Sequence, residues 1–500
     1  METEDNHIQV TAVALFDPST VPGGAVVRFK DILAHVDSRL HMNPLFRRRL
    51  VRVPLELDFP YWVDDENFDL EYHVQHARLP EPGDWRQLCI QLARFHARPL
   101  DQARPLWEML VIEGLDRIDG LPEGCYAIAT KLHHAAVDGA AIVKYFGALM
   151  DIDNKGTPAV PLDAVEATRS PQPGLLEMAR RAVWNTVRSP IGITDAVMRS
   201  APALYRWAQE SLYAQQEVTA KVPDTRFNCN ASPHKMFDAT TVNLDDLKTI
   251  RETVPGATIN DVVLAICGGA LRKFLKHHRE LPSESLVAWV PINARGGHAS
   301  EPEGPGNRIT SMTTPIFTDI EDPIARLRAI HGSTRKSKEA RSGVSARLMT
   351  DLSQHVPAAT LVTAGRLVLR AGVAANICNL FISNVPGPQT TMYMNGARQI
   401  ATYAIAPLVD GMGLFIATPS YDGKITFNVT STRETLPDIH FFVECVEASL
   451  AEMLKAATST RAAPDKPKAR KKTATRKTGS KKTTTRKTGS KKTASSKKVR

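Results

Sequence analysis

Short strand-like runs alternate with longer helical runs, and this alternation limits the possible folds more than any other feature. The run "IQVTAVALF" at 8–16 has the composition of a strand. The run "DWRQLCIQLARFHARPL" at 84–100 instead repeats apolar residues every three or four positions, as a helix does. A second alternating block follows residue 222. Strands that interleave with helices in both halves predict an α/β protein with two domains.

The second block is expected to begin with one long helix, "INDVVLAICGGALRKFLKHH" at 259–278, and to end with a helix that closes at about residue 457. Strands are expected between them at 285–295, 379–385, 413–421 and 424–432, with helical segments near 325–372.

A Pro-bearing stretch at 154–174 indicates an exposed connection between the two blocks. The amphipathic pattern at 175–220 favours a helical link over a membrane-surface helix, because acidic and basic residues mix on its polar side. We therefore divide the chain into an N-terminal domain at 1–151, a linker with connecting helices at 152–222, a C-terminal domain at 223–460 and a tail at 461–500.

The positive charge of the chain is concentrated in its tail. The formal net charge is +10, but residues 464–500 hold 16 Lys or Arg and one Asp, which leaves −5 for the rest. The tail contains the near-repeat "KKTATRKTGS" and "KKTTTRKTGS" at 471–480 and 481–490. Because it has almost no apolar residues to bury, we expect it to be disordered. Its charge suits an anionic membrane surface as a partner, although composition alone does not select one anionic partner over another. Nucleic acid, polyphosphate or no specific partner remain alternatives.

Several protein classes are disfavoured by composition and motif. The six cysteines are scattered without the spacing of a zinc or redox motif, which fits a reducing compartment. The acidic start "METEDNH" is unlike a secretory signal, and no run of about 18 apolar residues occurs. Neither a G-x-S-x-G elbow nor a phosphate-binding P-loop is found. We expect a soluble cytoplasmic protein that neither crosses a membrane nor forms a serine acyl-enzyme.

The segment "KLHHAAVDGAA" at 131–141 carries the strongest chemical signal. A strand-like run leads into His133 and His134, which must point to opposite sides of the strand, and Asp138-Gly139 would begin the following helix. An imidazole near a rigidly placed carboxylate suits a general base. A core histidine is the simpler alternative, and the pair His277-His278 shows that adjacency alone proves little. No third ligand accompanies the pair, so a metal site is not expected.

The same segment resembles the HHxxxDG motif of the bacterial wax ester synthase/diacylglycerol acyltransferase family. Further blocks resemble that family in the same order: "PLDQARPLWEMLVIEGL", "ATINDVVLAICGGALRKFL", "VPINARG", "GNRI", "NLFISNVPGP" and "SYDGKITF". The resemblance extends from about His7 to Asp438. It implies two chloramphenicol-acetyltransferase-like domains with the active site at their interface, and an O-acyltransferase without a cofactor.

By this resemblance, His134 is the general base that activates an acceptor hydroxyl for attack on a long-chain acyl-CoA, the co-substrate. His133 and Asp138 complete the catalytic motif, and Asp138 organises its loop, with Arg295 as a candidate ion-pair partner. The acceptor would be diacylglycerol or a long-chain alcohol, giving triacylglycerol or a wax ester. The enzyme would associate peripherally with the inner membrane or lipid inclusions. Alternatives are a condensation-type enzyme that uses a carrier-protein thioester, and a non-catalytic scaffold at lipid droplets or nucleic acid.

Each further candidate for substrate binding also has a structural interpretation. Asn260 and Asp261 would cap a helix, alone or while also lining the site. Ser383-Asn384 ahead of "PGP" would end a strand, and Asn384 would additionally face the cleft. The full set of substrate-binding candidates is Pro105, Leu106, Trp107, Gly139, Asn260, Asp261 and Asn384, of which the first three are equally explained as core anchors.

Two departures from the family pattern are visible. The family commonly opens with a longer lead that carries an L-S-x-x-D-type segment, whereas this chain starts close to its first strand. Thr432 stands where the family commonly has Asp. The first departure is expected to alter the substrate channel or solubility, and neither touches the histidine motif.

Overall fold

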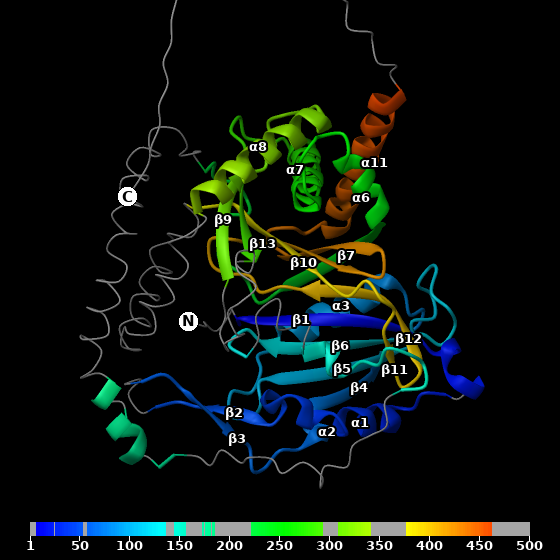
Figure 1. Cartoon of the computed structure of the whole chain (residues 1–500), viewed down its shortest axis with the longest axis vertical. Helices are drawn as coiled ribbons and strands as arrows, with labels where there is room; N and C mark the ends of the chain where they lie inside the picture. The colour runs from blue at the N-terminus through cyan, green and yellow to red at the C-terminus, as the bar shows by residue number, and fades with distance from the viewer. Residues whose placement is uncertain are drawn as a thin grey trace, which may run out of the picture. The chain divides into compact units, whose positions relative to one another are not determined.

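The computed structural model describes residues 7–24, 26–53, 58–136, 145–156, 173–174, 176–181, 183–185, 222–293, 309–341 and 377–462. These residues form two six-stranded sheets and one two-stranded sheet, with helices packed on the sheet faces (Figure 1). The predicted mixed α/β architecture is confirmed. The predicted tail lies outside the described residues from position 463 onward.

The first sheet has the strand order β11-β12-β1-β6-β5-β4. Its strands are β1 (Gln9–Asp17), β4 (Val74–Arg78), β5 (Trp107–Glu113), β6 (Tyr126–His133), β11 (Tyr393–Met394) and β12 (Ala397–Ile405). Neighbouring strands are antiparallel except β4 and β5, which are parallel. The strand expected at 8–16 is confirmed as β1. β12 falls inside the predicted C-terminal domain, yet it pairs with β1 in this sheet.

The two faces of the first sheet bury different sets of side chains, because successive residues of a strand point to opposite faces. One face packs against helix α1 (Phe29–Asp37) and includes Trp107 and Leu132. The other face packs against helix α3 (Trp85–Ala97) and includes Val13 and Ala129.

α3 begins at a capping box, in which the Asp84 carboxylate accepts from the Gln87 N–H and Gln87 reaches back to the Asp84 N–H. The helix expected at 84–100 is therefore confirmed, and its start is explained by a local capping signal.

The second sheet has the strand order β7-β14-β13-β10-β8-β9. Its strands are β7 (Lys235–Asn243), β8 (Val287–Asn293), β9 (Ile309–Pro315), β10 (Leu380–Pro386), β13 (Leu414–Tyr421) and β14 (Lys424–Thr432). The four strands expected in this half correspond to β8, β10, β13 and β14.

Among the described residues, four helices cover one face of this sheet: α6 (Leu244–Arg251), α7 (Ile259–His278), α8 (Pro323–Arg341) and α11 (Ile439–Ala462) (Figure 1). The long helix expected at 259–278 is confirmed as α7, and the closing helix is confirmed as α11.

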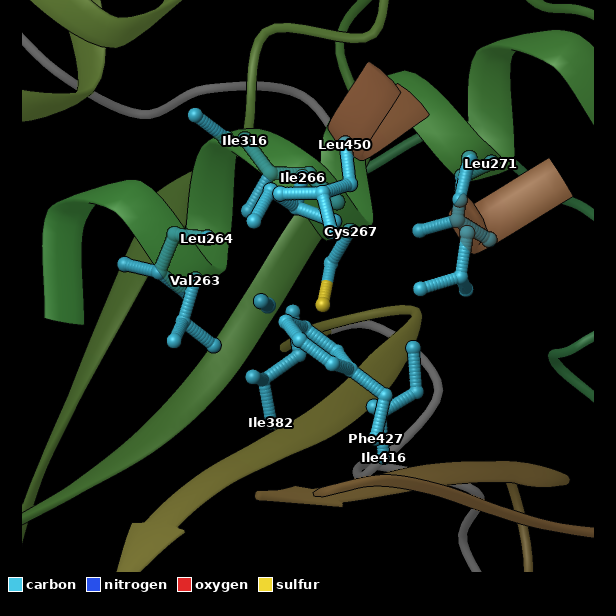
Figure 2. Close-up of a cluster of buried hydrophobic side chains, with 14 of the residues drawn as sticks. Val263, Leu264, Ile266, Cys267, Leu271, Ile316, Ile382, Ile416, Phe427 and Leu450 are labelled. Carbon is cyan, nitrogen blue, oxygen red and sulfur yellow. The ribbon is translucent and has the colours of Figure 1, made fainter. Parts of the chain in front are cut away.

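α7 is the centre of the second core. Its apolar side chains, among them Val263 and Cys267, face Ile382 and Phe427 of the sheet, while Leu450 of α11 packs beside Ile266 (Figure 2). Each fully buried side chain of this size stabilises the fold by about 1.5–3 kcal/mol. α7 is therefore held mainly by burial on several sides, which explains why its sequence is apolar almost all round.

The remaining elements are short and lie in the N-terminal half. They are the hairpin β2 (Arg48–Val51) and β3 (Tyr61–Asp64), helix α2 (Leu70–His73), and 3-10 turns at Pro18–Thr20, Pro22–Gly24, Leu40–Met42 and Pro44–Phe46.

The predicted linker helix is seen in part. Residues 176–181 and 183–185 are helical, and Met178 packs in a small apolar cluster with Val51 and Val63 of the hairpin. Residues 157–172, 175, 182 and 186–221 of the predicted linker, and helical residues expected at 342–372, lie outside the described residues. Within the described part of the chain, no helix combines the length and hydrophobicity that crossing a bilayer requires.

Gly268 allows α7 to approach the chain segment that follows β9. A Cβ at this position would lie 2.3 Å from the carbonyl oxygen of Ile316. We predict that Gly268→Ala lowers the free energy of unfolding by about 1–3 kcal/mol, because the backbone must shift to relieve the clash. Urea unfolding followed by circular dichroism would measure the change.

Gly332→Ala is the matched control. Gly332 lies in α8, and a Cβ there would meet nothing within 4 Å. The substitution should leave stability unchanged or raise it by up to about 1 kcal/mol, since alanine favours helix. Equal destabilisation by both substitutions would show that the close approach at Gly268 is not the cause.

Candidate active site

The strand β6 ends at His133, and His134 follows it directly. β6 lies between β1 and β5, and Gln9 of β1 is directly opposite His133. The backbone N–H of His133 donates to the Leu106 carbonyl oxygen at 3.1 Å, and that of His134 donates to the Ile8 carbonyl oxygen at 2.8 Å. The predicted position of the pair at the end of a strand is confirmed, and both residues are anchored through their backbones.

The His133 ring takes part in the turn that follows the strand. Its Nδ1 accepts a hydrogen bond from the Ala135 N–H at 3.0 Å, and its carbonyl oxygen accepts from the Ala136 N–H at 2.9 Å. A ring nitrogen that accepts cannot carry the proton, so the neutral His133 imidazole holds its proton on Nε2. One nitrogen of His133 is thus occupied by the backbone. The role of general base expected for His134 stays a prediction.

Three sequence candidates cannot be placed. Asp138, Gly139 and the possible ion-pair partner Arg295 all lie outside the described residues. The roles expected for them therefore stay predictions.

The residues Pro105, Leu106 and Trp107 are all buried. Trp107 is opposite Leu132 of β6, its indole N–H donates to the Phe46 carbonyl oxygen at 2.9 Å, and its ring stacks on His73 at 4.6 Å. These contacts describe a core anchor directly beside the strand that carries the histidines. A role in lining an acyl channel stays a prediction.

His73 packs against Trp107 and is hydrogen-bonded to it. Its Nδ1 donates to the Trp107 carbonyl oxygen at 2.7 Å, and burial lowers the pKa of His73, so the ring is neutral. His73 is a buried hydrogen-bonding residue that sequence reasoning missed.

The start of α7 differs in detail from expectation. Thr258, not Asn260, is the N-cap residue, and Asp261 occupies the third helical position of a capping box. The Thr258 N–H donates to the Asp261 carboxylate at 2.8 Å, and the Asp261 N–H donates to the Thr258 hydroxyl at 3.2 Å. The expectation of a capping role is right for Asp261 and wrong for Asn260, which is half-buried in the first turn. The signal that was missed is the T-x-x-D pattern.

Asp261 also joins α7 to α8. Its carboxylate accepts from the Thr334 hydroxyl at 2.7 Å and lies 3.1 Å from Nδ1 of His331. Asp261 is 1% exposed. Burial alone would raise the pKa of this carboxyl, but hydrogen bonds from Thr258, Thr334 and His331 together lower the pKa below its ordinary value. His331 and Thr334 had no recognisable motif in the sequence.

Asn384, a candidate for substrate binding, and Thr432, a departure from the family pattern, both lie near strand ends of the second sheet. Asn384 is half-buried on β10, paired with Thr418 of β13, and β10 ends at Pro386 as expected. Whether Asn384 faces a cleft stays a prediction. Thr432, the departure from the family pattern, is buried, and its hydroxyl accepts from the Thr435 N–H at 3.3 Å. A short polar side chain thus closes the turn at this position.

Among the residues that the structure describes, no group of three or more His, Cys, Asp or Glu side chains is arranged to hold a metal ion.

Comparison with known proteins shows what the chain is similar to. Residues 1–263 match the wax ester synthase/diacylglycerol acyltransferase catalytic domain, and residues 305–454 match the C-terminal domain of the same family. A putative diacylglycerol O-acyltransferase of Mycobacterium tuberculosis is 32% identical over 91% of this chain and 88% of its own length. The O-acyltransferase WSD of Acinetobacter baylyi is 31% identical over 75% and 79%.

Solved structures agree with these matches. The wax ester synthase/diacylglycerol acyltransferase from Marinobacter aquaeolei is similar with a TM-score of 0.64 at 26% identity, over 92% of this chain and 97% of that one. The trichothecene 15-O-acetyltransferase of Fusarium sporotrichioides has a TM-score of 0.56 at 11% identity, over 90% and 91%, and shares the fold alone. The chloramphenicol-acetyltransferase-like architecture expected from the sequence is confirmed.

Asp261→Asn tests the link between α7 and α8. We predict a loss of about 1–3 kcal/mol in the free energy of unfolding at pH 7, because the amide keeps the shape but loses charged hydrogen bonds. A carboxyl whose pKa is depressed in the folded state stabilises the protein above its unfolded pKa, about 3.9, and loses this contribution as pH falls through the folded value. The difference between the two proteins should therefore be constant well above a pH of about 3.9 and shrink as the pH falls below that value.

Urea unfolding at several pH values would measure this difference. Asp245→Asn is the control, since Asp245 is an exposed carboxylate in the first turn of α6, and its removal should change stability by less than about 0.5 kcal/mol. A difference between wild type and Asp261→Asn that does not vary with pH would contradict the assignment.

Proposed function

Because the chain belongs to the wax ester synthase/diacylglycerol acyltransferase family, we propose that it transfers a long-chain acyl group from acyl-CoA to the hydroxyl of diacylglycerol, and also to long-chain alcohols. The enzyme is an O-acyltransferase, and its substrates are an acyl-CoA and an acceptor with a free hydroxyl. The products would be triacylglycerol or a wax ester, together with free CoA.

The choice of base rests on the motif position of the two residues and on the contact of the His133 ring. Both backbones are anchored, by Leu106 and by Ile8, but Nδ1 of His133 accepts from the Ala135 N–H within the turn, and the second histidine of the motif is the base that the family resemblance implies. His134 would accept the proton of the acceptor hydroxyl. The acceptor oxygen would attack the thioester carbonyl carbon, and the C–S bond would then break. The protonated imidazole would return its proton to the CoA sulfur, so that no covalent enzyme intermediate forms.

The family match favours this proposal over the carrier-thioester alternative. Starter condensation domains are among the structural neighbours, for example that of rhizomide synthetase in complex with C8-CoA, at 10% identity and a TM-score of 0.51. That likeness concerns the fold alone. The sequence relatives over most of the chain are instead named as O-acyltransferases.

We also propose that residues 464–500 hold the enzyme at an anionic membrane or lipid-inclusion surface. The net charge of +15 in this segment supports the proposal, since each Lys or Arg near an anionic surface contributes about 1 kcal/mol. Nucleic acid and polyphosphate have the same anionic chemistry and belong in the same binding test.

His134→Ala should lower the rate of CoA release by about 10²–10⁴-fold, the usual contribution of a general base. The assay would follow CoA release from a long-chain acyl-CoA with diacylglycerol or a long-chain alcohol as the acceptor. His277→Ala is the matched control, because His277 belongs to an adjacent pair at the end of α7 and is exposed. It should keep wild-type activity.

Two results would count against the proposed reaction. Activity of His134→Ala within about tenfold of wild type would exclude His134 as the base. If wild type releases no more CoA than His134→Ala with either acceptor, the acceptor assignment is wrong and a carrier-bound thioester becomes the better candidate.

Deletion of residues 464–500 should leave CoA release with a dispersed acceptor unchanged and weaken binding to vesicles that contain anionic lipid. Added salt should weaken vesicle binding of the full chain far more than that of the shortened chain, because screening removes the attraction. Co-sedimentation with anionic vesicles, neutral vesicles, DNA and polyphosphate would measure this. Equal vesicle binding by both proteins would assign membrane attachment to residues 1–463.

A further inference from the structure

A buried ion pair lies close to the candidate histidines, two residues before His133. Lys131 of β6 is directly opposite Glu108 of β5, and its Nζ lies 3.0 Å from the Glu108 carboxylate. The Lys131 side chain is 0% exposed and that of Glu108 is 12% exposed. Both residues interrupt strands that are otherwise mostly apolar, "YAIATKLH" and "WEMLVIE". The two sequence blocks that resemble the family, around Trp107 and around His133, are therefore joined by one charged contact.

Lys131 also caps the end of α3. Its Nζ donates to the Phe95 carbonyl oxygen at 3.2 Å and to the Arg98 carbonyl oxygen at 2.9 Å, and it sits 4.5 Å from the centre of the Phe95 ring. The last carbonyl groups of a helix have no partner within the helix and carry its partial negative charge. A buried ammonium at this place satisfies both features.

Gln9 of β1 has a parallel role. Its side-chain amide donates to the Arg98 carbonyl oxygen at 2.8 Å and also to the His96 carbonyl oxygen. Gln9 is 1% exposed and is paired with His133 across the strands. The end of α3 is thus held by one side chain from β6, the strand that carries His133, and by one from the neighbouring strand β1.

The geometry connects this cap to the catalytic turn. Lys131 and His133 lie on the same face of β6, about 7 Å apart along the strand. The N–H of His133 donates to Leu106, two residues before Glu108. Movement at Lys131 would therefore be transmitted to the start of the turn through two residues of strand.

Stability alone is a poor explanation for this ion pair. Burying two charges is costly, and apolar residues of similar size often stabilise a fold as well or better. Burial lowers the pKa of Lys131 while the contact with Glu108 opposes that change, as expected for a desolvated ammonium with one partner. The pair links β6 to β5 and to the end of α3 through directional hydrogen bonds, which apolar side chains would not form.

We propose that Lys131 is a positioning residue, which holds the end of β6 against Glu108 and the last carbonyl groups of α3 so that the His133–Ala136 turn presents His134 in its reactive orientation. This inference rests on the proposed function in one respect, the assignment of His134 as the base. Lys131 does not need to contact either substrate.

The test compares Lys131→Met with the double variant Lys131→Met/Glu108→Leu. The single variant leaves a carboxylate without its cation, whereas the double variant removes both charges and should recover stability. Neither variant retains the hydrogen bonds from residue 131 to the end of α3, whereas Gln9 is unchanged in both. We expect kcat to fall about 10- to 100-fold in both, the usual effect of a misplaced catalytic group, with the KM for acyl-CoA within about twofold of wild type. Circular dichroism and thermal unfolding establish that each protein is folded at the assay temperature.

The pair Arg39–Asp151 supplies the matched control. It is also a buried ion pair, with side chains 8% and 2% exposed, and Arg39 likewise donates to a helix-end segment through the Met150 carbonyl oxygen at 3.2 Å. Arg39→Met and Arg39→Met/Asp151→Leu should lower the melting temperature to a similar degree and leave kcat within about twofold of wild type.

The outcomes separate the two proposals. Wild type and His134→Ala, measured in the same assay, decide the base assignment without reference to Lys131. A low kcat in the double variant at near wild-type stability supports positioning. A kcat within about twofold of wild type in either folded Lys131 variant overturns it, as does a kcat that falls equally in the Arg39 variants. If both Lys131 variants fail to fold, Lys131 is a folding residue and the positioning role is rejected.

Discussion

The pairing of β1 with β6 on one side and β12 on the other is the constraint on which the remaining geometry depends. The register places Thr11 opposite both Lys131 and Ile405. Because side chains alternate along a strand, a slip of one residue would turn every side chain of β1 to the wrong face. The register also sets the surroundings of the histidines, since it brings Gln9 opposite His133 and the Ile8 carbonyl oxygen to the N–H of His134.

β12 also connects the first sheet to the second. β12 does not pair with β14 as a neighbouring strand. Side chains of β14 instead accept hydrogen bonds from backbone N–H groups at the end of β12. The Ala404 and Ala406 N–H groups donate to Asn428 and Thr430, each at 3.2 Å. Both acceptor residues are 0% exposed. A buried side chain that satisfies a backbone group is costly to remove, because the partner is then left without a hydrogen bond. These contacts therefore join the two sheets without a continuous hydrogen-bonded strand pair.

Much of the secondary structure was predictable because its signals are local. The ends of α7 were predicted correctly from an apolar run that is long enough to exclude a strand, and α3 from its period. The strand that carries His133 was predictable from the strand-like composition of the run before it. The membership of β12 in the first sheet was not, since an alternating run does not identify its partner strand. The bounds of α7 match the prediction, but its N-cap residue is Thr258 and not Asn260, because the capping box joins Thr258 to Asp261.

The residues of the candidate site also fall into two groups: those that a local sequence pattern identifies and those that only the tertiary structure brings together. The sequence by itself determined which segment is the candidate for the chemistry, because adjacent imidazoles after a strand, with Asp138 beyond them, form a contiguous pattern. Only the tertiary structure decided that His133 uses Nδ1 within the turn, that Asp261 meets His331, and that Lys131 pairs with Glu108 while capping α3. A local pattern depends on neighbours in the chain, whereas the partner of a buried charge depends on strand register and on which helix end is packed against the strand.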